Sequence, residues 1–126
     1  MIDGKSLKYV VMALVSKDEH DQAHQLLDFF AEYADSLSDY DILGELSIKS
    51  QHHSLRLKCA EYTYARSTTT EQLFSARQNL YSCYNTLNYP EKALFYIDLN
   101  LKIKPNDHDT LIAKAANLAL MGKRKE

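Results

Sequence analysis

The sequence contains few residues that interrupt helices. Its 126 residues include three glycines, two prolines and no tryptophan. An all-β fold needs frequent turns rich in glycine and proline, so this composition argues against such a fold. The chain also lacks a glycine-rich phosphate loop, a GxSxG elbow and a paired-carboxylate signature. We therefore expect a helical protein without a catalytic site of its own.

An excess of charge of one sign is absent as well. The formal net charge is −2, which gives no bulk attraction to nucleic-acid phosphates or to anionic lipid. The apolar run near the start is too short to span a bilayer, and no small-residue cleavage site follows it. We expect a cytoplasmic protein that binds neither nucleic acid nor membranes.

Cysteines are also few. Cys59 and Cys83 lie within helical patterns and lack CxxC spacing. Reduced, buried thiols are therefore favoured over a disulfide or a metal site.

Apolar residues recur with helical periodicity along nearly the whole chain. The pattern predicts seven helices and no strand, with joints of only a few residues. The expected helices cover approximately residues 7–15, 23–34, 40–50, 54–66, 70–87, 90–104 and 108–121.

Start and stop signals support these boundaries. The pairs Ser16–Glu19 and Thr68–Glu71 have the spacing of capping boxes. Pro90 suits the first turn of a helix, and Pro105 ends the helix before it. Gly122 is the predicted end of the last helix.

The predicted helices form a repeat. Short joints force consecutive helices to lie antiparallel, so the repeating unit is a helical hairpin. Val10 corresponds to Gly44 at an interval of 34 residues, and Leu43 corresponds to Leu80 at an interval of 37. A period of 34 made of two helices is typical of one solenoid class.

The repeat resembles the tetratricopeptide repeat (TPR). Within residues 74–107, Leu80 and Tyr84 match the large residues of the family's first helix, Ala93 its small crossing residue, and Pro105 its final proline. The resemblance implies one all-α domain over residues 1–126, an α-solenoid of about three and a half repeats that forms a right-handed superhelix. The chain departs from the family pattern at Tyr81, Ile97 and Asn100.

The resemblance also implies a concave groove that binds a segment of a partner protein or peptide. Matching the chain to the family places ten residues in the groove: Lys8, Met12, Asp41, Glu45, Gln78, Ser82, Asn85, Asp109, Ile112 and Ala116. Of these, Gln78, Ser82 and Asn85 are the preferred contact residues. The groove is acidic in its middle and apolar at its C-terminal end, which favours a ligand with basic and apolar character.

A carboxylate clamp of the chaperone type is not expected in this groove. The positions that match the clamp carry Met12, Ile42, Ser75 and Asn79 in place of the required asparagines and basic residues. The favoured function is a protein-interaction scaffold without a cofactor. The alternative is a non-catalytic region of a larger enzyme, such as a transferase.

Two other side-chain groups could suggest different chemistry. His20 and His24 stand four residues apart, a spacing that can bind zinc, but no third ligand is evident, and a solvated helix face is the preferred interpretation. His52 and His53 fall in a predicted turn and also lack partners. The nine tyrosines could stack on bases, but several occupy packing positions of the repeat, and core packing is favoured.

The last predicted helix carries too many apolar residues for one packed face. They are Leu111, Ile112, Ala115, Leu118, Ala119, Leu120 and Met121. Terminal repeats of a solenoid normally present a polar outer face. We therefore expect the chain to be the N-terminal part of a longer protein, and to form, as it stands, a two-fold dimer through Leu111, Leu118 and Leu120.

Overall fold

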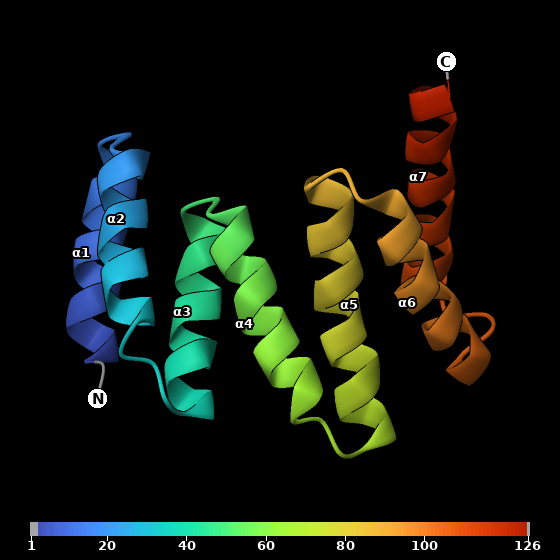
Figure 1. The fold of residues 1–126 in the computed structure, drawn as a ribbon, viewed down its shortest axis with the longest axis horizontal. Coiled ribbons are helices and arrows are strands. Elements are labelled where there is room, and N and C mark those ends of the chain that lie inside the picture. The colour runs from blue at the N-terminus through green and yellow to red at the C-terminus, as the bar shows by residue number, and fades with distance from the viewer. Residues whose placement is uncertain (1–2, 126) are drawn as a thin grey trace. The chain divides into compact units, whose positions relative to one another are not determined.

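A computed structural model describes residues 3–125, in which short joints connect α-helices and no strand is present (Figure 1). Its seven helices are α1 (Gly4–Ser16), α2 (His20–Ala31), α3 (Leu37–Lys49), α4 (His53–Ala65), α5 (Thr70–Thr86), α6 (Pro90–Ile103) and α7 (His108–Lys125). The predicted all-α class and the predicted number of helices are confirmed. None of the described helices is sufficiently long and apolar to cross a lipid bilayer.

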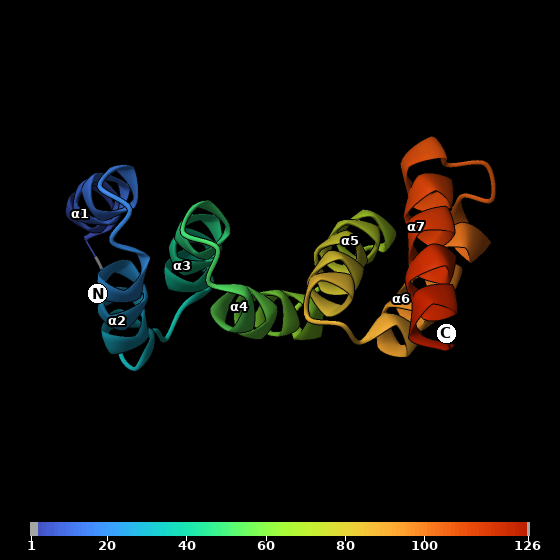
Figure 2. The ribbon, with the colours of Figure 1, turned by 90° about the horizontal axis from the view of Figure 1, so that it is seen from above.

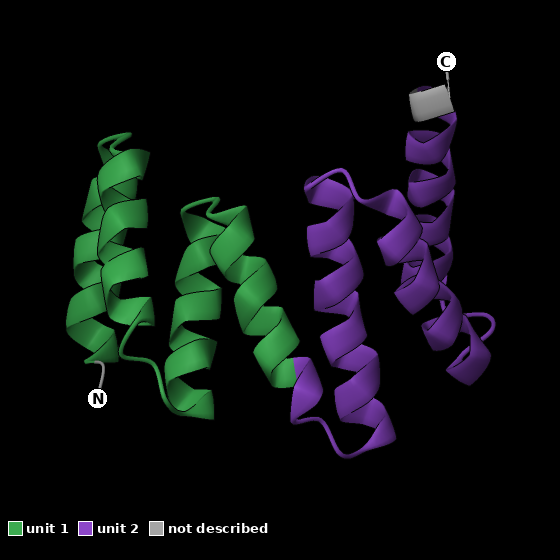
Figure 3. Ribbon diagram, in the orientation of Figure 1, with its two compact units in different colours: residues 1–63 green, residues 64–126 purple. Residues whose placement is uncertain are grey.

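The chain divides into two compact units, residues 1–63 and residues 64–126 (Figure 3). In the first unit, α1, α2 and α3 all contact one another. Figure 2 shows α1 and α3 on one side of this unit and α2 and α4 on the other. In the second unit, α6 packs against both α5 and α7, and α5 also contacts α7.

Three helical hairpins, α1–α2, α3–α4 and α5–α6, turn through the same local structure. Asp18, Gln51 and Asn88 have positive φ angles of 60°, 60° and 67°. The N–H of the following residue donates to the carbonyl oxygen five residues before it, at 2.9, 2.8 and 2.7 Å respectively. This is the six-to-one hydrogen bond of a Schellman motif. The joints are separated by 33 and then 37 residues, so the predicted interval of 37 is confirmed and the predicted interval of 34 is one residue too long.

α5 begins at Thr70 as predicted, but its capping box is shifted by one residue from the predicted pair. The side chain of Thr69, not Thr68, accepts a hydrogen bond from the Gln72 N–H at 3.1 Å, and the Gln72 side chain completes the capping box. Gln72 serves here because its amide oxygen accepts the N–H groups of Thr68 and Thr69.

The capping box predicted for α2 is wrong. The Ser16 hydroxyl donates to the Ala13 carbonyl oxygen at 2.8 Å, because Ser16 still belongs to α1. Glu19 precedes α2 without a side-chain cap. The Schellman turn at Asp18 fills the short joint between α1 and α2, where the predicted capping residue would have to lie.

The two prolines mark helix ends as predicted, whereas Gly122 does not. Pro90 is in the first turn of α6, and α6 ends at Ile103, ahead of Pro105. α7 continues through Gly122 to Lys125. Gly122 has no positive φ angle, so it does not use the left-handed conformation by which glycine ends helices.

Each unit has its own core. Leu7, Val11, Leu27 and Leu43 are among the buried residues of the first unit. In the second unit Ala93 and Ile97 of α6 are fully buried and pack with Tyr81 of α5. Cys59 and Cys83 are buried thiols, as predicted.

The departures from the family pattern are part of this core. Tyr81, Ile97 and Asn100 are all buried. The Asn100 side-chain amide donates to the Phe74 carbonyl oxygen at 3.0 Å. Since a buried amide without a partner is costly, this bond makes Asn100 a link between α6 and α5.

The first prediction concerns the closeness of α5 and α6. Replacing fully buried Ala93 by Phe should overpack the cluster and lower the free energy of unfolding by about 1–3 kcal/mol. Urea unfolding followed by circular dichroism measures the loss. Replacing exposed Ser75 of α5 by Phe is the control and should change the free energy of unfolding much less. An Ala93→Phe variant as stable as the wild type would contradict close packing at this site.

The second prediction concerns the hairpin joint at Gln51. A residue with a Cβ atom is destabilised by about 1–2 kcal/mol in the left-handed conformation. Glycine avoids this strain, but its greater loss of chain entropy on folding offsets about 0.5–1 kcal/mol of the gain. Gln51→Gly should therefore raise the free energy of unfolding by up to about 1 kcal/mol. Asn88→Gly should gain less, because asparagine tolerates this conformation. A larger gain at Asn88 than at Gln51 would be the opposite of what we expect.

Candidate functional site

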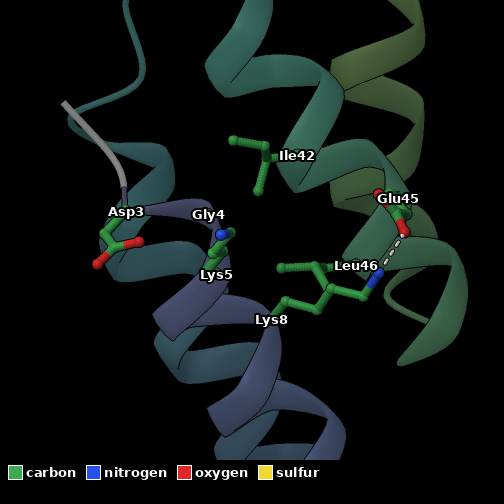
Figure 4. A pocket seen from close by; sticks show the side chains of 7 residues that line it. All are labelled: Asp3, Gly4, Lys5, Lys8, Ile42, Glu45 and Leu46. Atoms are coloured by element: carbon green, nitrogen blue, oxygen red, sulfur yellow. Dashed lines mark hydrogen bonds and ion pairs between the residues drawn. The ribbon is translucent and has the colours of Figure 1, made fainter.

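A groove lies between α1 and α3 in the first unit. It encloses about 620 Å³ and is lined by Asp3, Gly4, Lys5, Lys8, Ile42, Glu45 and Leu46 (Figure 4). Two of these residues, Lys8 and Glu45, belong to the groove surface that the sequence predicts. The groove is therefore the place where the predicted surface and an observed cavity coincide.

An ion pair bridges the two helices at the groove. Lys8 Nζ lies 3.3 Å from Glu45 Oε1, and both side chains are about half exposed, at 54% and 53%. Exposed ion pairs of this kind contribute only about 0–1 kcal/mol. Both groups can therefore exchange their mutual contact for contacts with a ligand at little cost.

The rest of the α3 side of the groove is apolar. Figure 4 shows Ile42 and Leu46 projecting from α3 toward α1. A Cβ atom on Gly4 would lie 2.9 Å from Ile42 Cδ1, so the absence of a side chain at Gly4 lets Ile42 approach the start of α1. The groove thus combines an apolar wall with charged groups at its edge.

Of the charged residues at the start of α1, one has hydrogen-bond partners and one has no ion-pair partner among the described residues. The Asp3 carboxylate accepts hydrogen bonds from the Ser6 hydroxyl at 2.8 Å and from the Ser6 N–H at 3.4 Å. These hydrogen bonds lower the pKa of Asp3, so the carboxylate stays ionised as the cap of α1. Lys5 is exposed, and none of the described carboxylates lies within ion-pair distance of it.

The structure brings only two residues of the predicted groove surface to this cavity. Lys8, Met12, Asp41 and Glu45 are all exposed, and Lys8 and Glu45 are in contact. The sequence did not indicate Asp3, Gly4, Lys5 or Leu46 as lining residues, and it singled out Ile42 only as a clamp position. Helical spacing could have indicated Lys5 and Ile42, because each stands three residues before a predicted groove residue and therefore lies on the same side of its helix.

One of the preferred contact residues of α5 is engaged within the second unit. Gln78, Ser82 and Asn85 are all half-buried. The Asn85 side-chain oxygen accepts a hydrogen bond from Asn117 of α7 at 2.8 Å. Burial is the main cause that raises the pKa of Tyr81, which neighbours this set on α5. Of the three residues, Asn85 is held within the second unit by a side-chain hydrogen bond.

The predicted residues of α7 are accessible. Asp109, Ile112 and Ala116 are exposed. Of the predicted self-association residues, Leu111 and Leu118 are 42% and 49% exposed, whereas Leu120 is half-buried. An exposed apolar surface therefore lies on this helix.

The histidines of α2 have a structural role that the sequence did not indicate. His24 Nε2 donates to the Ser50 carbonyl oxygen at 2.7 Å, and His20 Nδ1 lies 3.3 Å from the same oxygen. Ser50 is the C-terminal cap of α3, so both imidazoles serve a carbonyl at a helix end. The prediction of a solvated helix face is therefore wrong for these two residues.

His52 joins the same cluster from the α3–α4 joint. Its Nε2 lies 2.7 Å from Asp28 Oδ1, and its ring centroid lies 4.4 Å from that of His24. Within residues 3–125, no group of three or more histidine, cysteine, aspartate or glutamate side chains has an arrangement that could hold a metal ion. The cluster thus connects α2 to the end of α3.

The third prediction tests this assignment. His24→Ala removes the shorter hydrogen bond to Ser50, so it should lower the free energy of unfolding by about 1 kcal/mol. The loss should be the same with and without EDTA, because it does not depend on a metal. His53→Ala is the control and should cost less. A loss that disappears in EDTA would instead assign His24 to a metal site.

Comparisons of the chain with protein-family models, with curated proteins and with solved structures find no match. Function is therefore inferred from the chain's own residues. Two surfaces are informative: the groove between α1 and α3, and the exposed side of α7.

Proposed function

We propose that this chain is a protein-interaction module that holds a segment of a partner protein and catalyses no reaction itself. In this proposal its helical hairpins form a TPR-like, right-handed α-solenoid of about three and a half repeats. The observation that carries the proposal is the α1–α3 groove, in which Lys8 and Glu45 of the predicted groove surface meet beside an apolar wall.

The hairpin joints support the repeat. A residue in the left-handed conformation, followed by a six-to-one hydrogen bond, recurs at Asp18, Gln51 and Asn88. Identical joints give successive hairpins the same internal geometry, which is the requirement for stacking them as a repeat. Stacked helical hairpins present their first helices on one continuous surface, and such surfaces bind extended or helical segments.

The groove indicates the chemistry of the bound segment at this end. Ile42 and Leu46 offer a surface for an apolar side chain. Lys5 lacks a carboxylate partner among the described residues, and Lys8 can leave its exposed partner Glu45. An apolar residue next to an acidic one therefore fits best here. Buried thiols at Cys59 and Cys83 are consistent with a reducing compartment, and the proposal places the protein in the cytoplasm.

The fourth prediction tests the groove with a defined probe. Peptides selected from a random phage-displayed library on the wild-type chain should be enriched in apolar residues next to Asp or Glu. Fluorescence anisotropy then measures their dissociation constants. In the double variant Lys5→Glu, Lys8→Glu the affinity should fall at least about tenfold, since two attractive contacts become repulsive.

The control for this experiment carries the same change in net charge elsewhere. Lys17→Glu with Lys102→Glu alters two exposed lysines outside the groove and should leave the affinity nearly unchanged. A library that yields no binding peptide, or peptides that bind the groove variant as tightly as the wild type, would refute the proposed function.

A further inference from the structure

Helix α7 buries polar residues and exposes apolar ones. Thr110 and Asn117, on its buried side, are fully inaccessible to solvent. Leu111, Ile112 and Leu118 lie outside the packed side and are 42%, 62% and 49% exposed. Ala113 of α7 does pack against the core of the second unit, but a surface helix normally keeps its large apolar residues on that side as well. The exposed leucines and isoleucine indicate that the outer side of α7 meets another apolar surface.

Buried Asn117 fixes the orientation of α7. Asn117 Nδ2 lies 2.7 Å from the Pro90 carbonyl oxygen and 2.8 Å from Asn85 Oδ1. Turning Leu111 and Leu118 inward would break both bonds of Asn117 and leave its buried amide group unsatisfied. The apolar side therefore stays outward in the folded chain.

The exposed side has the shape of a helix-packing surface. At 3.6 residues per turn, Ala115 and Ala119 form its centre line, with Leu111 and Leu118 on one flank and Ile112 on the other. Small residues on the centre line let a second helix approach closely, and the flanking apolar residues can then pack around it. All five of these residues are exposed.

The charges at the ends of this surface are complementary to those of a second copy. Asp109 lies in the first turn of α7, and Lys123 lies near its end, both exposed. They are about 21 Å apart at 1.5 Å per residue. A second α7 in antiparallel orientation places Lys123 near Asp109 at both ends at once. A parallel copy would instead oppose like charges and like helix dipoles.

We propose that the outer side of α7 is a homodimer interface in which two copies of the helix pack antiparallel about a two-fold axis. The interface uses Leu111, Ile112, Ala115, Leu118 and Ala119, with Asp109 and Lys123 at its ends. Asp109 and Ile112 also belong to the predicted partner-binding surface, but the interface shares no residue with the groove between α1 and α3, so loss of the dimer and loss of peptide binding in that groove are distinguishable. A two-fold axis brings the same patch of each copy into contact, so the Asp109–Lys123 charge pair forms at both ends of the interface.

Analytical ultracentrifugation over a range of protein concentrations tests the proposal. The wild type should reach a limiting mass of two chains. Leu118→Glu should weaken dimerisation at least about 100-fold, because the change acts on both copies of the interface. Ile112→Glu is a second variant at a more exposed position, and circular dichroism confirms that both variants remain helical. Ile48→Glu is the matched control, since Ile48 of α3 is 51% exposed, and should not affect the mass.

Charge reversal tests the antiparallel orientation. Asp109→Lys and Lys123→Asp should each weaken the dimer, and the two changes in one chain should restore it. A wild type that remains a monomer would overturn the interface, and would leave the outer side of α7 to a different partner or to further chain. A mass that rises beyond two chains without limit, or a dimer that is insensitive to Leu118→Glu, would overturn it as well. Single reversals without recovery in the double variant would overturn the antiparallel arrangement.

Discussion

The left-handed turn between paired helices determines most of what this chain presents to its surroundings. At Asp18, Gln51 and Asn88 a single residue with positive φ and one six-to-one hydrogen bond reverse the chain. Each reversal sets two helices antiparallel, which decides which side of each helix is buried. In the first unit α1 and α3 are also in contact and form a groove. In the second, α6 lies in contact with both α5 and α7.

Much of this fold could be predicted from sequence because helix periodicity and prolines are local signals. The helix count, the start of α6 at Pro90 and its end before Pro105 all follow from them. The turns were hidden because none uses glycine, so Gln51 gave no stop signal and a shift of one residue entered the predicted repeat. Gly122 misled in the opposite direction, because it lies within α7. Residue type alone does not settle which residue takes the left-handed conformation.

The candidate site, like the fold, could be predicted only in part. The family resemblance placed Lys8 and Glu45 on one surface, and the structure brings them into contact, but the cavity beside them depends on how closely Ile42 approaches Gly4. The histidine contacts to Ser50 are equally tertiary, because α2 meets the end of α3 only in the folded unit. Sequence periodicity did indicate that α7 has more apolar residues than one packed side needs. It did not show that Thr110 and Asn117 occupy the packed side.

The proposed function and the proposed dimer both require that an exposed helix surface of this chain associates with another chain, and the outer side of α7 is the surface most open to a direct test. The most direct measurement mixes isotopically labelled wild-type chain with unlabelled chain that carries a nitroxide at Asn106→Cys, an exposed position just before α7, with alanine in place of Cys59 and Cys83. Nuclear magnetic resonance then records which signals of the labelled chain broaden. An antiparallel dimer predicts broadening around Lys123, at the opposite end of α7. Broadening confined to the start of α7, or none at concentrations where the labelled chain is folded, would contradict it.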